Sequence, residues 1–132
     1  MNKKELCEKA VTAKEKALPT YSHFHVGAAL LTKDNKLYIG GNIESSSYGL
    51  TICAERTALF TALLDGAREF EAIAIAGGDG DDYCPPCGAC RQVLMDYCGG
   101  DLKVYLTNNS NEIKEFKLKE LIPYSFGEEN LK

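Results

Sequence analysis

The order of apolar and polar residues predicts a helix followed by a hairpin at the start of the chain. Apolar positions recur at helical intervals over residues 3–17, and Pro19 is expected to end that helix. Two apolar runs, residues 26–31 and 37–39, flank a short polar turn and predict an antiparallel pair of strands. Gly40-Gly41 is expected to break the second strand and to begin a polar loop.

The rest of the chain alternates helical and strand-like segments. The expected helices cover residues 53–64, 88–97 and, as a single turn, 119–122, and the expected strands cover residues 70–76, 102–106 and 113–118. The strand–helix–strand crossovers in the second half of the chain imply that the strands they join are parallel neighbours, whereas the hairpin is antiparallel, so the five strands should form one mixed sheet. Helices on both faces of such a sheet make the expected fold α/β, a three-layer α/β/α sandwich.

Length and composition fit a single domain over residues 1–132. No apolar run approaches the ~20 residues needed to span a membrane, and the N-terminus lacks the apolar segment of a signal peptide. A cytoplasmic protein without a membrane partner is therefore expected. The net charge of −4 argues against a nucleic-acid partner and favours a small-molecule substrate.

Cysteines carry the strongest chemical pattern in the chain. Six of them without an export signal favour metal binding or catalysis over disulfides. Pro86-Cys87-Gly88-Ala89-Cys90 has the two-residue spacing typical of zinc ligands, and Cys53 precedes Glu55 by one intervening alanine. Three protein ligands leave a coordination position open, as in catalytic zinc sites. The sequence predicts one Zn²⁺ per subunit, bound by Cys53, Cys87 and Cys90, with Glu55 placed to move protons.

The surroundings of these cysteines should favour thiolates. Both motifs are expected at helix N-termini, at the end of the sheet where ligands usually bind. The partial positive charge of a helix N-terminus lowers the pKa of a thiol. Three thiolates give a zinc centre an excess of negative charge, so we assign Arg56 the role of donating a hydrogen bond to one of them.

Other interpretations of these residues remain open from the pattern alone. Glu55 also suits the first turn of any helix, where the dipole stabilises a carboxylate. Cys84-Pro85-Pro86-Cys87 is a second Cys-x-x-Cys and could serve in redox chemistry or as a further zinc ligand. Cys7 and Cys98 fall in helical segments and are expected to be small core residues.

Five segments make the chain resemble the small homotetrameric zinc-dependent cytidine deaminases nearly from end to end. They are Tyr21-Ser22-His23-Phe24-His25-Val26-Gly27-Ala28-Ala29, Asn42-Ile43-Glu44, Cys53-Ala54-Glu55-Arg56-Thr57-Ala58, Pro86-Cys87-Gly88-Ala89-Cys90-Arg91-Gln92 and Leu121-Ile122-Pro123-Tyr124-Ser125-Phe126. The resemblance implies hydrolytic deamination of cytidine and 2′-deoxycytidine in pyrimidine salvage, with zinc as the cofactor and Glu55 as the proton carrier.

The same resemblance implies which residues contact the nucleoside. Asn42 and Glu44 would hold the base and the ribose hydroxyls, with Glu44 reaching the 3′-hydroxyl. Phe24 would stack on the pyrimidine, and the backbone N–H of Ala54 would bond to the base. The resemblance also implies a homotetramer in which neighbouring subunits complete each active site. Tyr48 and Phe126 occupy the positions that would be supplied across these interfaces.

Two rival functions fit parts of the pattern. A blasticidin S-type deaminase would use the same zinc motifs, but Asn42-x-Glu44 suits a ribose and favours the nucleoside. A structural zinc module without catalysis would close the site with a fourth cysteine, Cys84, and leave Glu55 without a role. His23 and His25 are expected to be surface or interface residues and not ligands.

Overall fold

The computed structural model describes residues 1–131. Its helices are α1 (Lys3–Ala13), α2 (Ala54–Leu64), α3 (Gly88–Cys98) and α4 (Leu118–Leu121), its strands are β1 (Val26–Thr32), β2 (Leu37–Gly41), β3 (Phe70–Gly77), β4 (Lys103–Thr107) and β5 (Ile113–Lys117), and short 3₁₀ turns lie at Lys14–Lys16, Tyr48–Leu50 and Glu128–Leu131. Every expected helix and strand is present, and all except the first helix end within one or two residues of their expected bounds.

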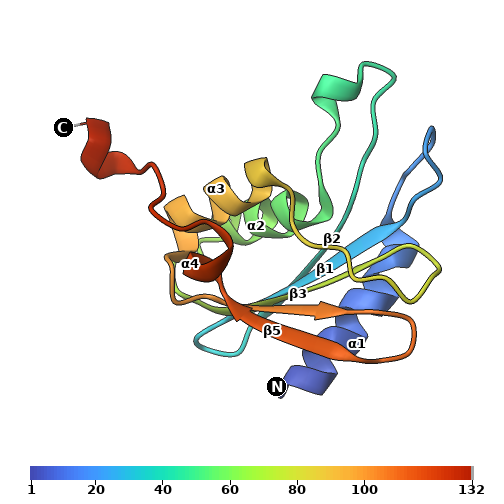
Figure 1. Cartoon of the computed structure of the whole chain (residues 1–132), viewed down its shortest axis with the longest axis horizontal. Coiled ribbons are helices and arrows are strands. Elements are labelled where there is room, and N and C mark those ends of the chain that lie inside the picture. Colours follow the sequence, from blue (N-terminus) through green and yellow to red (C-terminus); the bar gives the residue numbers. More distant parts are fainter. Residues whose placement is uncertain (132) are drawn as a thin grey trace.

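The strands form one mixed sheet, as expected, and their order is β2-β1-β3-β4-β5 (Figure 1). β1 pairs antiparallel with both β2 and β3, and β5 pairs antiparallel with β4. Only β3 and β4 are parallel neighbours among the described residues, joined by the crossover that contains α3. The crossover through α2 also joins parallel strands, but β1 lies between them, so the expectation that each crossover makes parallel neighbours was wrong for β2 and β3.

The sheet separates two apolar cores, because successive side chains of a strand point to opposite faces. In β3, Ile73 and Ile75 face the core shared with α2 and α3, whereas Ala72, Ala74 and Ala76 face the core shared with α1. Figure 1 shows α1 on one face of the sheet and α2 and α3 on the other. The predicted three-layer α/β/α sandwich is confirmed.

The first helix is shorter than expected. α1 ends at Ala13, and the chain continues as a 3₁₀ turn before it becomes extended at Ala17. Leu18 then donates its N–H to the carbonyl of Asn42 at 2.8 Å and forms a parallel bridge with Ile43. The chain therefore leaves the helix to pair with the segment that follows β2, two residues before Pro19 could have ended it.

Gly40 and Gly41 continue β2 and do not break it, so that expectation was wrong. They pair with β1, and their role is to let other backbone segments approach the strand. A Cβ atom on Gly40 would lie 2.5 Å from the carbonyl oxygen of Ala54, and one on Gly41 would lie 2.7 Å from the nitrogen of Ala17. The first of these contacts brings the start of α2 directly against the end of β2.

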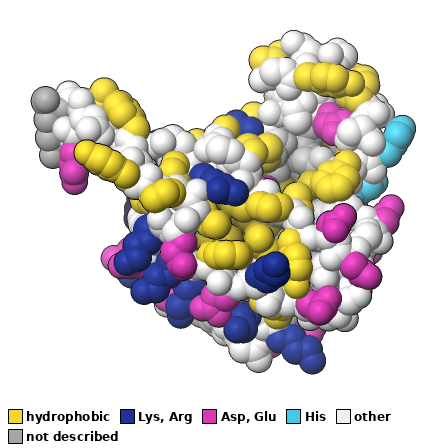
Figure 2. Space-filling view, in the orientation of Figure 1, with side chains coloured by type: hydrophobic (Ala, Val, Ile, Leu, Met, Phe, Trp, Pro, Cys, Tyr) yellow, Lys and Arg dark blue, Asp and Glu magenta, His cyan; other side chains and the backbone are white. Residues whose placement is uncertain are grey.

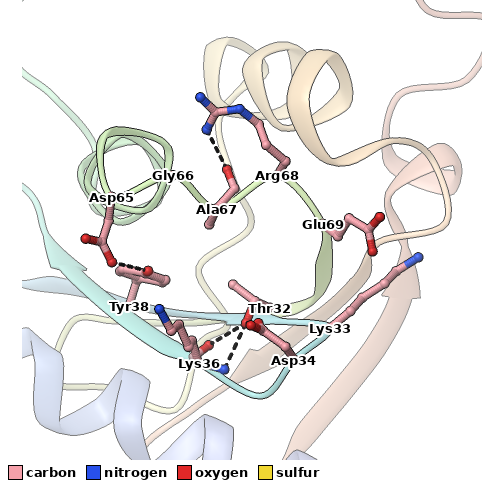
Figure 3. Close-up of a pocket in the computed structure, with 10 residues that line it drawn as sticks. All are labelled: Thr32, Lys33, Asp34, Lys36, Tyr38, Asp65, Gly66, Ala67, Arg68 and Glu69. Carbon is pink, nitrogen blue, oxygen red and sulfur yellow. Dashed lines mark hydrogen bonds between the residues drawn. The ribbon is translucent and has the colours of Figure 1, made fainter.

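A pocket of about 330 Å³ lies at the C-terminal end of α2, the opposite end of that helix from Cys53 (Figure 3). Hydrogen bonds made by residues that line this pocket hold the turn after α2 in place. Asp65 accepts a hydrogen bond from the hydroxyl of Tyr38 at 2.5 Å, and Arg68 donates to the carbonyl of Ala67 at 2.7 Å. The pocket lies where α2, β2 and the start of β3 meet, and none of the predicted site residues lines it.

Within residues 1–131, no helix is both long enough and apolar enough to cross a membrane.

Candidate metal centre and active site

Two helices begin at the predicted metal ligands. Cys53 is the N-cap residue of α2 and Cys87 is the N-cap residue of α3, and Cys90 lies in the first turn of α3. Neither N-cap cysteine makes a side-chain capping bond, so both thiols are free to face a shared point. The expected placement of both motifs at helix N-termini is confirmed.

The three thiols have the spacing of a zinc site. The Sγ atoms of Cys53 and Cys87 lie 3.7 Å apart, those of Cys87 and Cys90 lie 3.5 Å apart, and all three fall within 4.8 Å of one another. Tetrahedral zinc with Zn–S bonds of about 2.3 Å separates its sulfur ligands by about 3.8 Å. Three soft donors at this spacing fit Zn²⁺ and leave a fourth tetrahedral position without a protein ligand from this cluster.

The electrostatics of the cluster favour a thiolate at Cys53. A hydrogen bond from the Cys90 thiol, followed by one from Arg56, lowers the pKa of Cys53 to about 5. Cys53 therefore carries negative charge at neutral pH, which is the form that binds a metal.

Glu55 lies in the first turn of α2, beside the cluster, and is only 3% exposed. Burial raises the pKa of its carboxyl to about 7, and the neighbouring Cys53 thiolate acts in the same direction. A carboxyl with a pKa near neutrality can both accept and release a proton during turnover. Most first-turn glutamates are solvated, so burial distinguishes Glu55 from an ordinary helix-capping acid.

Arg56 points its guanidinium at the metal ligands, as its predicted role requires. Its Nη2 lies 3.4 Å from the Sγ of Cys53, and its Nε is buried without a hydrogen-bond partner among residues 1–131. Arg56 as a whole is half-buried, and burying part of a guanidinium favours nearby negative charge that offsets the desolvation. The thiolates of a loaded zinc centre supply that charge.

We expect Arg56→Gln to lower kcat by about ten- to a hundredfold, the usual range for residues that orient metal ligands. The neutral amide leaves the negative charge of the thiolates without compensation, which makes the centre less able to polarise water. Turnover and zinc content are measured together. Arg68→Gln is the matched control, because Arg68 lies beyond the far end of α2 and, among residues 1–131, its side-chain hydrogen bonds go to the backbone carbonyls of Leu63 and Ala67. Unchanged turnover and zinc content in the Arg56 variant would remove this role.

The remaining cysteines stand outside the ligand group. Among the described residues, the thiols that can hold one metal ion are those of Cys53, Cys87 and Cys90. Cys84 is half-buried, and burial raises its pKa to about 11, which disfavours the thiolate. Cys7 is buried in the core beneath α1, as expected, and Cys98 packs at the edge of the other core.

Next to the cysteines, the end of β2 positions the residues predicted to bind the nucleoside. The hydroxyl of Thr57 in α2 donates to the carbonyl of Gly41 at 3.0 Å, which fixes this strand end against the metal centre. Asn42 follows directly and is 7% exposed. Its side chain accepts from the N–H of Val26 at 2.9 Å and donates to the carbonyl of Phe24 at 2.9 Å. Asn42 thus ties the loop before β1 to the end of β2.

Phe24 lies over Gly77, which ends β3, and over Gly78, which follows it. A Cβ atom on Gly78 would lie 2.8 Å from the Phe24 ring, and one on Gly77 would lie 2.8 Å from the Sγ of Cys84. The ring therefore rests on bare backbone, and 47% of the residue stays exposed. An aromatic ring supported on one side and open on the other can stack on a planar base.

Glu44 and Ala54 complete the predicted contacts. Ala54 is the first residue of α2, where backbone N–H groups lack helical partners and can bond to a ligand. Hydrogen bonds from Ser22 hold the pKa of the Glu44 carboxyl below its usual range, so it remains an acceptor at neutral pH. His23 and His25 are both exposed, and the structure includes neither in the metal-ligand group.

Tyr48 and Phe126 lie on segments that project from the body. Tyr48 is 74% exposed in the loop between β2 and α2, and Phe126 is 58% exposed in the C-terminal segment. Figure 2 shows hydrophobic side chains on both projections, which point away from the sheet in the view of Figure 1. Leu50 and Tyr124 add further exposed apolar surface to them.

Sequence reasoning assigned no role to Arg91 or Ser22. Arg91 follows Cys90 and donates to the carbonyls of Pro86 and Leu121, both at 2.7 Å, so it fixes the loop that carries Cys87. Its position directly after a ligand, within a segment that carries the family resemblance, was the available indication. Ser22 bonds to Glu44, and no pattern in the sequence links two residues so far apart.

Fold and cluster together define a zinc-dependent hydrolase site on an α/β/α sandwich. The family described as "Cytidine and deoxycytidylate deaminase zinc-binding region" matches residues 1–106. The chain belongs to this family, and its cofactor is zinc.

Relatives and solved structures agree over nearly the whole length. A cytidine deaminase of Halalkalibacterium halodurans is 49% identical over 131 residues, which cover 99% of this chain and 98% of the relative. The crystal structure of a cytidine deaminase from Burkholderia pseudomallei matches with a TM-score of 0.91 and 46% identity over 96% of this chain and 100% of that one. The crystal structure of the cytidine deaminase from Mycobacterium tuberculosis matches with a TM-score of 0.84 and 34% identity, over 96% of this chain and 98% of that one.

Proposed function

We infer that this chain hydrolyses cytidine and 2′-deoxycytidine to uridine and 2′-deoxyuridine with release of ammonia. The carrying observation is the convergence of three cysteine thiols at zinc spacing beside the buried carboxyl of Glu55. Cytidine deaminases that align along nearly the whole chain support the same reaction. Nucleosides are therefore the substrate class.

The residues of the site divide the work of the reaction. Cys53, Cys87 and Cys90 would hold the zinc, and the chemistry that it would supply there is Lewis-acid activation of water. Glu55 takes a proton from the attacking water and delivers it to N3 of the ring. After the hydroxyl has added at C4, Glu55 carries the remaining proton of that hydroxyl to the amino group, and the C4–N bond breaks to release ammonia as the C4 carbonyl forms. Its raised pKa suits both directions of transfer.

Four residues around the metal centre make the proposed contacts with the nucleoside. Phe24 stacks on the pyrimidine ring from its support on Gly77 and Gly78, and the N–H of Ala54 bonds to the base. Asn42 and Glu44 lie at the end of β2 and bind the base edge and a sugar hydroxyl. Shape and hydrogen bonding at these positions favour a nucleoside over a free base.

The reaction is tested by the loss of ultraviolet absorbance and the release of ammonia when zinc-loaded protein meets cytidine, 2′-deoxycytidine or blasticidin S. Turnover of both nucleosides is the expected result, because Glu44 offers a partner to a sugar hydroxyl that both share. A zinc-loaded protein that leaves both nucleosides intact would contradict the proposed function. Turnover of blasticidin S alone would assign the site to that antibiotic.

We propose in addition that residues 1–132 act as one cytoplasmic catalytic domain that assembles into a homotetramer with shared active sites. All six cysteines are free thiols, which fits a reducing compartment. Exposed aromatic residues on projecting segments support burial against other copies of the chain, since single soluble chains seldom expose contiguous apolar surface of this kind. Tyr48 and Phe126 are the residues that neighbouring subunits would supply.

Shared sites predict that two defective variants restore each other. Glu55→Gln removes the proton carrier, and Phe126→Ala removes the side chain lent to a neighbour. Random co-assembly after co-expression should give about a quarter of parental activity, because each site then has a one-half chance for each intact contributor. Co-assemblies no more active than the Phe126→Ala protein alone would show that each subunit completes its own site. Size-exclusion chromatography with light scattering checks the oligomeric state.

A further inference from the structure

The carboxylate of Glu44 is already held by the loop before β1. Its Oε1 accepts the backbone N–H of Tyr21 at 3.0 Å and that of Ser22 at 2.9 Å. The hydroxyl of Ser22 donates to the other oxygen, Oε2. One serine thus contacts both carboxylate oxygens, through its backbone and through its side chain.

These bonds leave little acceptor capacity on Glu44. An ionised carboxylate offers about four lone-pair sites, and three donors from Tyr21 and Ser22 use three of them. Because Oε1 has two of these donors, the remaining capacity lies on Oε2. A ligand therefore meets a carboxylate with a fixed orientation and room for about one further hydroxyl.

Ser22 is itself held in place by Phe24. The backbone N–H of Phe24 donates to the Ser22 Oγ at 3.0 Å. With one lone pair of the hydroxyl occupied in this way, its single proton is directed to Glu44. The chain of bonds therefore runs from the N–H of Phe24 through the Ser22 hydroxyl to Oε2 of Glu44.

The loop is held in a conformation that makes these contacts possible. His23, between Ser22 and Phe24, has a φ of 60°, a left-handed value that few side chains adopt without compensation. Its N–H bonds to the carbonyl of Pro19 at 2.9 Å. This turn presents the N–H of Ser22 and its hydroxyl to the same carboxylate.

We propose that Ser22 is a positioning residue that orients Glu44 so that Oε2 accepts one sugar hydroxyl of the nucleoside. This role rests on the proposed function, since it assumes that Glu44 binds the sugar. A single acceptor site cannot hold a 2′,3′-diol through both hydroxyls. Within that diol the 3′-hydroxyl is the one that cytidine and 2′-deoxycytidine share, so if Oε2 accepts it, the two substrates should depend on Ser22 equally.

Ser22→Ala tests the proposal through steady-state kinetics with three substrates. The loss of a hydrogen bond to an exposed charged group should raise KM about tenfold for cytidine and 2′-deoxycytidine, with kcat nearly unchanged because ground-state and transition-state binding are lost together. For the substrate that lacks both hydroxyls, 2′,3′-dideoxycytidine, KM should change less than about twofold. Ser22→Thr keeps the hydroxyl and should restore the parental KM.

Two controls separate positioning from a general loss of structure. Ser110→Ala removes another exposed serine hydroxyl that donates to a carboxylate, that of Asp81, which is not one of the proposed substrate contacts, and should leave KM unchanged for all three substrates. In a Glu44→Ala background, Ser22→Ala should have no further effect on cytidine, because the two residues act through one contact.

Several outcomes would overturn the proposal. They are equal changes for cytidine and dideoxycytidine, no change in KM, no rescue by threonine, or additive effects in the double variant. If Ser22→Ala does not fold, the Glu44→Ala protein decides, because the proposal requires it to lose its preference for cytidine over dideoxycytidine. A parent protein inactive on all three substrates would instead contradict the proposed function.

Discussion

Replacing Glu55 with glutamine should lower kcat for cytidine by at least about 10²- to 10⁴-fold, the range that a general acid–base group contributes. Glutamine keeps the shape of the side chain and can still accept a hydrogen bond, but it cannot carry a proton between water and the ring. Zinc content should stay at the parental level, because Glu55 lies beside the three thiols and is not part of the metal-ligand group. Single-wavelength absorbance assays and metal analysis on the same preparation measure both quantities.

Glu5→Gln provides a matched control for the interpretation of Glu55 as an ordinary first-turn glutamate. Glu5 lies in the first turn of α1 and forms the capping box with Asn2. Glutamine can fill the same capping role, so this variant should keep full activity. A Glu55→Gln protein that turns over cytidine at the parental rate would show that the buried carboxyl does not move protons.

Much of the fold was predictable because β3 has an unambiguous pattern. Its small and large apolar residues alternate with the period of a strand, which identifies it as a core strand. In the structure the two sets of residues face two different cores. The end of β2 was not predictable, because a glycine pair is compatible both with a break and with a close backbone approach. Only the packing of Ala54 and Ala17 against Gly40 and Gly41 distinguishes the two cases.

The metal centre was predictable for a different reason. Ligand spacing within Cys87-Gly88-Ala89-Cys90 is local, and both ligand motifs open helices whose starts the sequence indicates. The contacts of Glu44 were not predictable, because they depend on how the loop at Ser22 folds back over a distant strand end. Roles for Tyr48 and Phe126 rest on other copies of the chain, which no local pattern describes.

Cys87→Ser should abolish tight zinc binding and, with it, turnover. The apparent free energy of zinc binding in structural sites is about 10–16 kcal/mol. If the four ligands of such a site share it equally, each ligand contributes roughly a hundred- to a thousandfold in affinity. Cys87 is the best ligand to replace because it is exposed, whereas Cys90 is fully buried and its loss would also disturb the core. Metal analysis after dialysis against a weak chelator measures the loss.

Cys84→Ser decides between a catalytic and a structural centre. If the site is built from Cys53, Cys87 and Cys90 alone, the serine variant should keep one zinc per subunit and most of its activity, because the thiol of Cys84 lies outside the ligand group. A four-cysteine structural module makes the opposite demand, since removing any of its ligands would release the metal. Zinc loss from Cys84→Ser, alongside the zinc loss expected from Cys87→Ser, would contradict the three-thiol assignment, because a fourth thiol ligand would close the coordination position that hydrolysis requires to be open.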